Sequence, residues 1–392
     1  MKNTTQLDYS QDAQFAISKL EAVHPIFLLE EVKDYAKAKA EYIKATSKPI
    51  TLTELRLATR KYVAVLGDGH VSLYLQQPND LSYFNIDWVA NGGRLFLLDE
   101  EKKPTNIEVV NIGGIPVSKV TAQVDMYYAA ENEAARQNNY AMFCRQEDMI
   151  RLAGCDYAFP DIKLSTSEGK TMACKFAPMK RQPPGYIVKH EMIDDVFYID
   201  LRMFQPDKTI DDVVEKIKAA IQDGRQKFII DIRDNPGGNS NVGKQLVEAM
   251  GMRTPSYGMF ARHNDLVQQQ SAFHISKGES TNFEPNKNTA KPNENITLLV
   301  LTNVKTFSSA TMLGVWTQDG KLGKVVGQTS SNRPNAYGDM LSVDLPISGI
   351  KLSISFKRFL RPDTDADPDS LIPDIEVPFG EDILAAALEY MV

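Results

Sequence analysis

The sequence contains little cysteine and little histidine. Its 392 residues include three cysteines and five histidines. Cys144, Cys155 and Cys174 are too few for a disulfide framework and lack the spacing of metal ligands, so we expect packed thiols. The five histidines also leave little from which to build a metal cluster, and we predict no metal site.

Long apolar runs and an excess of positive charge are missing as well. No apolar run approaches the length of a membrane span, so we expect no integral membrane segment. The net charge of −7 offers no basic surface for nucleic acid, and we predict no nucleic-acid partner. The first residues, MKNTTQLDYSQD, lack the apolar stretch of a signal peptide. This fits either a cytoplasmic protein or a chain whose signal peptide has been removed.

What the chain does contain is enough apolar sequence for a large core in two or three domains. Apolar residues recur at helical spacing in the first part of the chain, and strand-like patterns dominate the second part. In the third part, strand patterns alternate with helix patterns. Such alternation favours a mostly parallel, buried sheet. We predict a multi-domain α/β (α+β) protein with an N-terminal helical bundle, a β-rich module with a helical insertion, and an α/β core, at residues 1–68, 69–190 and 191–392. In the core we expect strands at 196–201, 228–232 and 296–301, and helices at 210–221 and 242–250.

Two adjacent serines lie between a predicted strand and a predicted helix. The run 296–301 fits a buried strand, and apolar residues recur at helical spacing from Ala310 onward. Ser308 and Ser309 therefore lie where a helix begins and where backbone N–H groups can meet a developing negative charge. Serine is also a common helix N-cap, and this motif alone favours that simpler interpretation.

A glycine turn follows the strand that precedes this one in the core. The stretch FIIDIRDNPGGNSN, residues 228–241, begins with a predicted buried strand, and a turn that contains Gly237 and Gly238 follows this strand. Adjacent glycines allow close approach of a ligand and can present N–H groups to it. An oxyanion hole, a phosphate cradle and a plain tight turn all fit this pattern. The phosphate cradle is the weakest of them, because Gln245 stands where a Ser or Thr would bind magnesium.

A histidine follows another glycine turn near the start of the β-rich module. His70 comes directly after Gly67-Asp68-Gly69 and begins an alternating strand. A single histidine in such a place is usually structural. Any partner for its ring would have to come from elsewhere in the chain.

Taken together, these motifs resemble those of the tail-specific, or C-terminal processing, serine peptidases. FIIDIRDNPGGN, LLVLTNVKTFSSATMLG and VVGQTSSNRPNAYGD follow one another in the order of that family's core. LGDGHVSLY, residues 66–74, resembles the D-G-H-T-x-L element of the histidine-using branch, which includes the tricorn protease. The resemblance extends from about residue 10 to the C-terminus.

The resemblance implies a crotonase-like (ClpP/crotonase-type) α/β core and a β module of PDZ-like type. It places the nucleophile at Ser309, because the small residue Ala310 follows it, and the oxyanion donors at the N–H groups of Ala310 and of Gly237 or Gly238. It implies no metal and no organic cofactor. It also implies work outside the cytoplasm, in the periplasm or after secretion.

The resemblance leaves two possible bases, and the sequence favours the histidine. One branch uses a lysine just past V-V-G-x-T, but this chain has Arg333 there, and arginine does not give up its proton near neutral pH. His70 is then the expected base. Its acid partner maps to Asp367, shortly before the strand around Ile375. The nearby alternatives are Asp363, Asp365 and Asp369, and a more distant candidate is Asp339.

We therefore predict a serine endopeptidase that hydrolyses peptides or unfolded proteins through an acyl-enzyme. Ser309 would attack, His70 would accept its proton, and Asp367 would orient His70. The alternative is a degenerate relative that binds a peptide or an apolar ligand without cleaving it, since the chain has Asp where the family has Glu and Arg333 where one branch has Lys.

Overall fold

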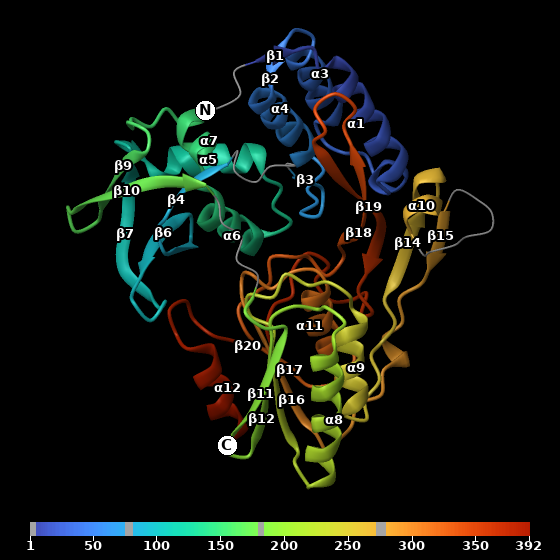
Figure 1. Ribbon diagram of the computed structural model, residues 1–392. Helices are drawn as coiled ribbons and strands as arrows, with labels where there is room; N and C mark the ends of the chain where they lie inside the picture. The colour runs from blue at the N-terminus through green and yellow to red at the C-terminus, as the bar shows by residue number, and fades with distance from the viewer. Residues whose placement is uncertain (1–4, 75–80, 179–183, 272–279) are drawn as a thin grey trace.

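The N-terminal part of the chain is helical. The computed structural model describes residues 5–74, 81–178, 184–271 and 280–392 (Figure 1). A short strand before the first helix pairs with another that directly precedes the last helix. The N-terminus of that last helix is closed by a capping box between Thr51 and Glu54. These elements are α1 (Ser10–Val23), α2 (Ile26–Leu29), α3 (Tyr35–Ala45), α4 (Leu52–Ala64), β1 (Gln6–Leu7) and β2 (Ile50–Thr51).

An antiparallel sheet with helices beside it forms the second part. Its strand order is β4-β10-β9-β7-β6-β5, and β8 pairs with β7. The bounds are β4 (Ser82–Phe84), β5 (Trp88–Asn91), β6 (Arg94–Leu98), β7 (Pro104–Ile112), β8 (Ile115–Pro116), α5 (Val117–Tyr127), α6 (Glu133–Phe143), α7 (Glu147–Leu152), β9 (Asp161–Thr166) and β10 (Thr171–Pro178). Cys144, Cys155 and Cys174 are free and buried in its core, which confirms the prediction of packed thiols.

A mostly parallel sheet forms the third part, in the order β11-β12-β13-β16-β17-β20. Only the first pair, β11 with β12, is antiparallel. Helices α8, α9 and α11 cover one face and α12 covers the other, as Figure 1 shows. The bounds are β11 (Val188–Ile193), β12 (Val196–Leu201), α8 (Lys208–Gln222), β13 (Lys227–Asp231), α9 (Asn241–Ala249), β16 (Thr297–Thr302), α11 (Ser309–Asp319), β17 (Lys324–Gly327), β20 (Ile375–Glu376) and α12 (Ile383–Met391).

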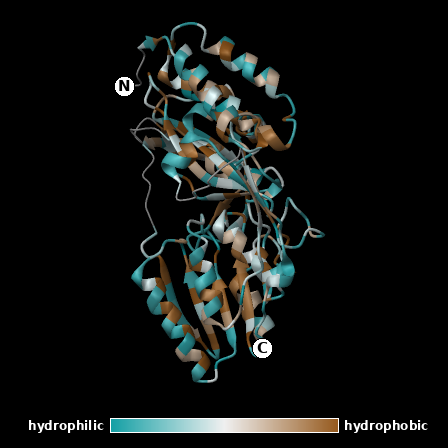
Figure 2. Cartoon of the chain, turned by 90° about the vertical axis from the view of Figure 1, so that its right-hand side faces the viewer, coloured by the Kyte–Doolittle hydropathy of each residue, from teal (hydrophilic) through white to brown (hydrophobic). Residues whose placement is uncertain are grey.

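Burial explains why these strands are continuous apolar runs. Both faces of the sheet are covered, so side chains pointing either way are apolar. Phe228, Ile229 and Ile230 are all completely buried. In Figure 2 the strands of this sheet are mainly brown, whereas the helices beside them carry both brown and teal segments. None of the helices in the described residues is long and apolar enough to cross a membrane.

A further antiparallel sheet joins the third part to the N-terminal helices. Its order is β15-β14-β19-β18, and β3 pairs with β19. The bounds are β3 (Ser72–Tyr74), β14 (Gly258–Arg262), α10 (Asp265–Gln270), β15 (Ser280–Phe283), β18 (Tyr337–Asp344) and β19 (Lys351–Leu360), with a 3-10 turn η2 (Lys287–Thr289) between β15 and β16. Leu20 and Leu55 from the helices share one core with Leu352 and Ile354 of β19. Because β3 pairs with β19, the segment just before β3, which contains His70, lies beside this sheet.

Candidate active site

Ser308 is held in an unusual backbone conformation at the start of α11. It follows the loop after β16 and has φ of 55° and ψ of −125°. Residues other than glycine rarely adopt positive φ, because it brings Cβ close to the backbone, so the surroundings must hold this conformation. The side chain of Asn332 does so in part, since its Oδ1 accepts a hydrogen bond from the Ser308 N–H at 3.0 Å.

The structure brings His70 to this serine. The distance from His70 Nε2 to Ser308 Oγ is 3.1 Å, within hydrogen-bond reach, although the two residues are 238 positions apart in the chain. The imidazole is 6% exposed and lies against the ring of Phe307, with ring centroids 4.6 Å apart. A proton can therefore pass directly between the serine and the histidine.

Ser309, the serine that the sequence predicted, does not face His70. Its Oγ donates a hydrogen bond to the carbonyl of Gly238 at 2.6 Å. Ser309 is the first residue of α11, and the helical backbone turns its side chain toward the glycine turn. Ser308, just outside the helix, has the conformation that exposes its hydroxyl to His70. The candidate nucleophile is therefore Ser308 in place of Ser309.

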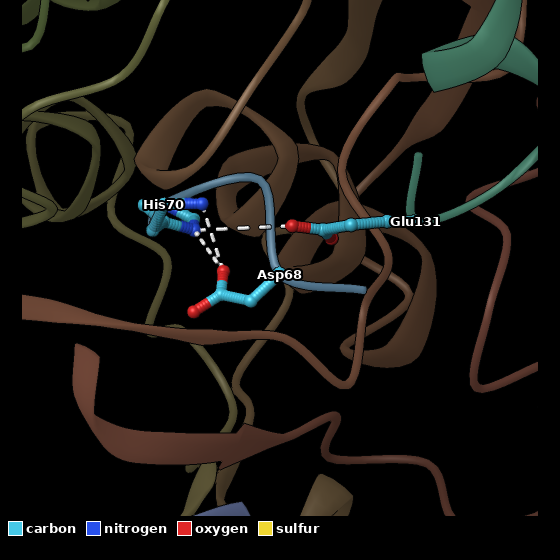
Figure 3. A group of neighbouring side chains, drawn as sticks. All are labelled: Asp68, His70 and Glu131. Carbon is cyan, nitrogen blue, oxygen red and sulfur yellow. Dashed lines mark hydrogen bonds and ion pairs between the residues drawn. The ribbon is translucent and has the colours of Figure 1, made fainter. Parts of the chain in front are cut away.

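Two buried carboxylates, which the sequence analysis did not single out, lie beside His70 (Figure 3). Asp68 Oδ1 lies 3.4 Å from His70 Nδ1 and accepts the backbone N–H of His70 at 2.8 Å. Glu131 Oε1 is 3.9 Å from the same Nδ1. Neither contact at Nδ1 has the alignment of a hydrogen bond. The turn sequence Asp68-Gly69-His70 was a usable signal for Asp68, whereas nothing near Glu131 indicated its role.

These charges shift the pKa values in the site. Burial alone would lower the pKa of His70, but Asp68 and Glu131 outweigh it and the pKa of His70 is raised. Burial works against the Asp68 anion too, yet the hydrogen bond from His24 and the close approach of the His70 ring leave the pKa of Asp68 lowered. For Glu131, burial dominates and raises the pKa. Asp68 is thus the negative charge that stabilises an imidazolium at His70.

The acidic residues suggested by the sequence are engaged elsewhere. Asp367 Oδ1 accepts the backbone N–H groups of Asp369 and Ser370 at 2.8 and 3.1 Å, as in a turn. The other candidates pair with cations at or below 3.7 Å: Asp339 with Lys357, Asp363 and Asp365 with Lys287, and Asp369 with Arg333. Within the described residues, none of these carboxylates forms a hydrogen bond or ion pair with His70. Asp68 therefore replaces Asp367 as the candidate partner.

Of the predicted oxyanion donors, Gly238 keeps an N–H group that is free in the part of the chain that the structure describes, whereas the N–H groups of Gly237 and Ala310 are engaged. The N–H of Gly237 donates to Asn235 Oδ1 at 2.9 Å, and the N–H of Ala310 donates to the carbonyl of Phe307 at 3.1 Å. Within the described residues, the N–H groups of Gly238 and Ser309 donate to no protein group. Gly237 packs so tightly here that a Cβ on it would lie 2.7 Å from Ser308 Cβ. Gly238 and Ser309 are therefore the candidate oxyanion donors.

Glu131 links the segments of the site. Its Oε1 accepts the N–H of Gly69 at 3.0 Å, and its Oε2 accepts Asn332 Nδ2 at 2.6 Å and the N–H of Arg333 at 2.9 Å. Arg333 also donates to the Glu131 carbonyl at 3.0 Å. Because Asn332 in turn accepts from Ser308, Glu131 couples the histidine segment to the serine segment.

The cluster of Asp68, His70 and Glu131 has ligand atoms close enough to surround a cation, all within 4.8 Å of one another. Each oxygen of both carboxylates nevertheless accepts at least one hydrogen bond from a protein donor. A metal ion would have to compete with these donors. The donor set therefore fits proton transfer through His70 better than metal ligation.

Ser308 opens onto a groove with room for an extended chain. The groove has a volume of about 1180 Å³, and its lining includes His70, Gly238, Tyr257 and Lys357. Lys244, the lysine of the possible phosphate cradle, pairs along α9 with Glu248 at 3.9 Å and does not line this groove. A second cavity of about 700 Å³ shares Gly69 and Phe307 with this groove.

Sequence comparison gives the family of the core. Residues 195–377 match the family model of Peptidase family S41. These residues belong to the S41 peptidases. The S41 segment contains Ser308, Gly237 and Gly238, whereas His70, Asp68 and Glu131 lie before it in the chain. No curated protein matches the chain by sequence.

Several solved structures share the fold over nearly the whole chain. The structure titled mature CPAF aligns with a TM-score of 0.67 and 14% identity, covering 98% of this chain and 95% of that one. Mature CPAF complexed with lactacystin gives a TM-score of 0.66 at 14% identity, covering 98% and 96%. The photosystem II D1 C-terminal processing protease gives 0.50 at 14% identity, covering 95% and 93%. At these identities the likeness shows the fold.

Proposed function

We propose that this S41 protein is a serine peptidase that cleaves peptide bonds in peptides or unfolded proteins, with Ser308 as nucleophile. The contact of 3.1 Å between His70 Nε2 and Ser308 Oγ carries this proposal. Serine is a weak nucleophile at its ordinary pKa, so a base within hydrogen-bond reach is the essential requirement.

The reaction follows from the positions of these groups. Ser308 Oγ bonds to the carbonyl carbon of the substrate while its proton passes to His70 Nε2. The charge that develops on the carbonyl oxygen is met by the N–H groups of Gly238 and Ser309. His70 then gives the proton to the leaving amine as the peptide bond breaks. Water hydrolyses the resulting ester by the same route in reverse, which releases the acid and restores Ser308.

The finer fold assignment also stays a proposal. We infer a crotonase-like core at 191–392 and a PDZ-like module at 69–190, following a helical bundle at 1–68. The parallel sheet flanked by helices supports the first, and the glycine turn between β7 and β8 in an antiparallel sheet supports the second. The core shared by the N-terminal helices and β19 indicates that the bundle depends on the third part of the chain.

The catalytically inactive alternative has one observation in its favour. His70 Nδ1 lacks a well-aligned hydrogen bond, although Asp68 lies only 3.4 Å away. Catalytic hydrogen bonds often tighten only when substrate binds, so this geometry is compatible with either function. A direct test of serine reactivity is therefore needed.

Labelling with a fluorophosphonate probe, followed by peptide mapping, tests the proposal. We expect the adduct on Ser308, its loss in Ser308→Ala, and a decrease of at least about 100-fold in labelling rate in His70→Ala. Ser309→Ala is the matched control and should still be labelled, because Ser309 bonds to Gly238 and not to His70. An adduct on Ser309, or a folded wild-type protein that neither reacts with the probe nor cleaves peptides, would contradict the proposal.

A further inference from the structure

Asp68 contacts a second histidine, from the N-terminal helices. His24 follows α1 and is completely buried. Its Nε2 lies 3.1 Å from Asp68 Oδ2, while Asp68 Oδ1 faces His70 on the other side of the carboxylate. His24 therefore lies behind the acid partner of the proposed catalytic histidine.

The hydrogen bonds of His24 fix which of its nitrogens carries the proton. The backbone N–H of Ile26 donates to His24 Nδ1 at 3.2 Å, so this nitrogen must be unprotonated. The proton then sits on Nε2 and is donated to Asp68 Oδ2. His24 is accordingly a neutral donor whose direction is set by the turn that follows α1.

The rest of the His24 residue is held equally firmly. Its N–H donates to the Leu20 carbonyl at 2.9 Å, and its own carbonyl accepts Arg262 Nη1 at 3.1 Å. Its ring lies against Tyr337 of β18, with centroids 4.6 Å apart. The imidazole thus has little freedom to move away from Asp68.

The two oxygens of Asp68 have separate partners as a result. Oδ2 accepts from His24 and from Ser355 Oγ, the latter at 2.6 Å. Oδ1 accepts the His70 N–H and stays 3.4 Å from His70 Nδ1. A carboxylate whose far oxygen is fixed by two donors cannot rotate away from the histidine that it stabilises.

We propose that His24 is a positioning residue for hydrolysis, which directs Asp68 toward His70 by donating from Nε2 to Asp68 Oδ2. This inference rests on the proposed function, in which His70 deprotonates Ser308. It gives the N-terminal helices a role in the chemistry, although they lie outside the S41 segment.

Two substitutions separate the two hydrogen bonds of His24. In His24→Gln the amide nitrogen replaces Nε2 and can still donate to Asp68. In His24→Asn the side-chain oxygen replaces Nδ1 and can still accept from Ile26, but the shorter side chain no longer reaches Asp68. We expect His24→Gln to label with fluorophosphonate within about threefold of wild type, and His24→Asn to label roughly 10- to 100-fold more slowly.

The pKa of His70, followed by NMR on ¹⁵N-histidine-labelled full-length protein, provides a readout independent of reactivity. The charged groups facing His70 are Asp68, Glu131 and Asp339. Around His24 the charged groups are Asp68 and Arg262, and the neutral ring of Tyr337 packs against its imidazole. We expect the His70 pKa to fall in His24→Asn, because Asp68 loses its fixed orientation. In His24→Gln, which keeps the donor to Asp68, the His70 pKa should stay unchanged. A purely structural His24 would lower thermal stability in both variants without this difference.

The outcomes separate the inference from the proposed function. Equal His70 pKa values and equal labelling in the two variants would overturn the role of His24. So would an NMR spectrum of wild-type protein that places the His24 proton on Nδ1, and this measurement decides the question even where His24→Asn does not fold. Wild-type protein that shows Nε2–H on His24 and the expected His70 shifts but no labelling would overturn the peptidase proposal and leave the positioning of His70 supported.

Discussion

Ser308 and His70 show how much of the site depends on single residues. The hydroxyl of Ser308 faces His70 because its backbone has positive φ, and Asn332 and the absence of a side chain on Gly237 accommodate that conformation. A shift of one position along the chain moves the hydroxyl to the carbonyl of Gly238, where Ser309 lies. The identity of the nucleophile is therefore set by one backbone conformation.

The acid partner gives the first residue-scale prediction. We expect Asp68→Asn to lower the fluorophosphonate labelling rate by at least about 100-fold, because a neutral amide cannot stabilise the imidazolium of His70. Asp367→Asn is the control, since the Asp367 carboxylate accepts backbone N–H groups in its own turn and, among the residues that the structure describes, forms no hydrogen bond or ion pair with His70. Peptide hydrolysis and labelling should remain near wild type there. A large loss in Asp367→Asn together with an active Asp68→Asn would reverse our assignment.

The pH dependence of the labelling rate gives the second residue-scale prediction. The neutral form of His70 is the base, and its raised pKa means that this form becomes dominant only above the ordinary histidine value of about 6.5. The labelling rate should therefore rise with pH, with a midpoint above that value. In Glu131→Gln a neighbouring negative charge is removed, so the midpoint should move to lower pH. A wild-type midpoint below about 6 would show that burial outweighs the carboxylates.

The sequence predicted the chemistry better than the individual residues. It indicated a serine nucleophile at the start of α11, which it placed at Ser309, together with His70 as the base and a glycine turn nearby, because residue types and motif order carry that information. It could not distinguish between two adjacent serines, since their difference lies in φ. Asp68 lies only two residues before His70, and the turn sequence offered a signal for it. Glu131 instead depends on a contact between distant segments, since it meets Gly69 across 62 positions. No local pattern reports such a contact.

At the scale of elements, the predictions for the core were accurate to within one or two residues. The helix expected at 210–221 is α8 at Lys208–Gln222, and the strand expected at 228–232 is β13 at Lys227–Asp231. Both have strong signals, because α8 buries one face and β13 is buried on both. The turn between β13 and α9 was also located, but its role required knowledge of what packs against it.

That turn gives an element-scale prediction. Gly238 has φ of 135°, and a Cβ on it would lie 2.3 Å from the Phe204 carbonyl oxygen. We expect Gly238→Ala to reduce the free energy of unfolding by roughly 3–5 kcal/mol, from backbone strain together with overpacking. Chemical denaturation of wild type and Gly238→Ala would measure this difference in the free energy of unfolding.

Gly224→Ala is the matched control for this substitution. Gly224 also has positive φ, 84°, but a Cβ there would meet nothing within 4 Å. It should therefore cost only the backbone strain, about 1 kcal/mol, and leave labelling of Ser308 intact. Equal costs at the two glycines would show that the contact with Phe204 relaxes easily.

At the scale of the whole molecule, the site is assembled from all three parts of the chain. Asp68 and His70 follow the N-terminal helices, Glu131 lies between α5 and α6, and Ser308 belongs to the S41 segment. The sheet of β18 and β19 holds these parts together, since it pairs with β3 and packs against α1. Reactivity at Ser308 should therefore depend on contacts far from it.

Asp12 makes the clearest of these distant contacts. Its buried carboxylate, in the first turn of α1, accepts the N–H groups of Ile347 and Ser348 at 2.7 and 2.9 Å, in the turn between β18 and β19. Asp12→Ala leaves both donors without their charged acceptor. We expect a loss of roughly 2–3 kcal/mol in the free energy of unfolding, measured by chemical denaturation.

Asp8→Ala tests whether this loss comes from the link between parts and not from the start of α1. Asp8 is exposed and accepts the N–H of Ser10, two residues away within the same segment. It should shift the denaturation midpoint much less than Asp12→Ala. If Asp12→Ala also slows labelling of Ser308 in protein that is still folded, then the link from α1 through β19 to Asp68 and His70 transmits the packing of the helices to the site. A destabilised protein with an unchanged labelling rate would instead confine the role of Asp12 to stability.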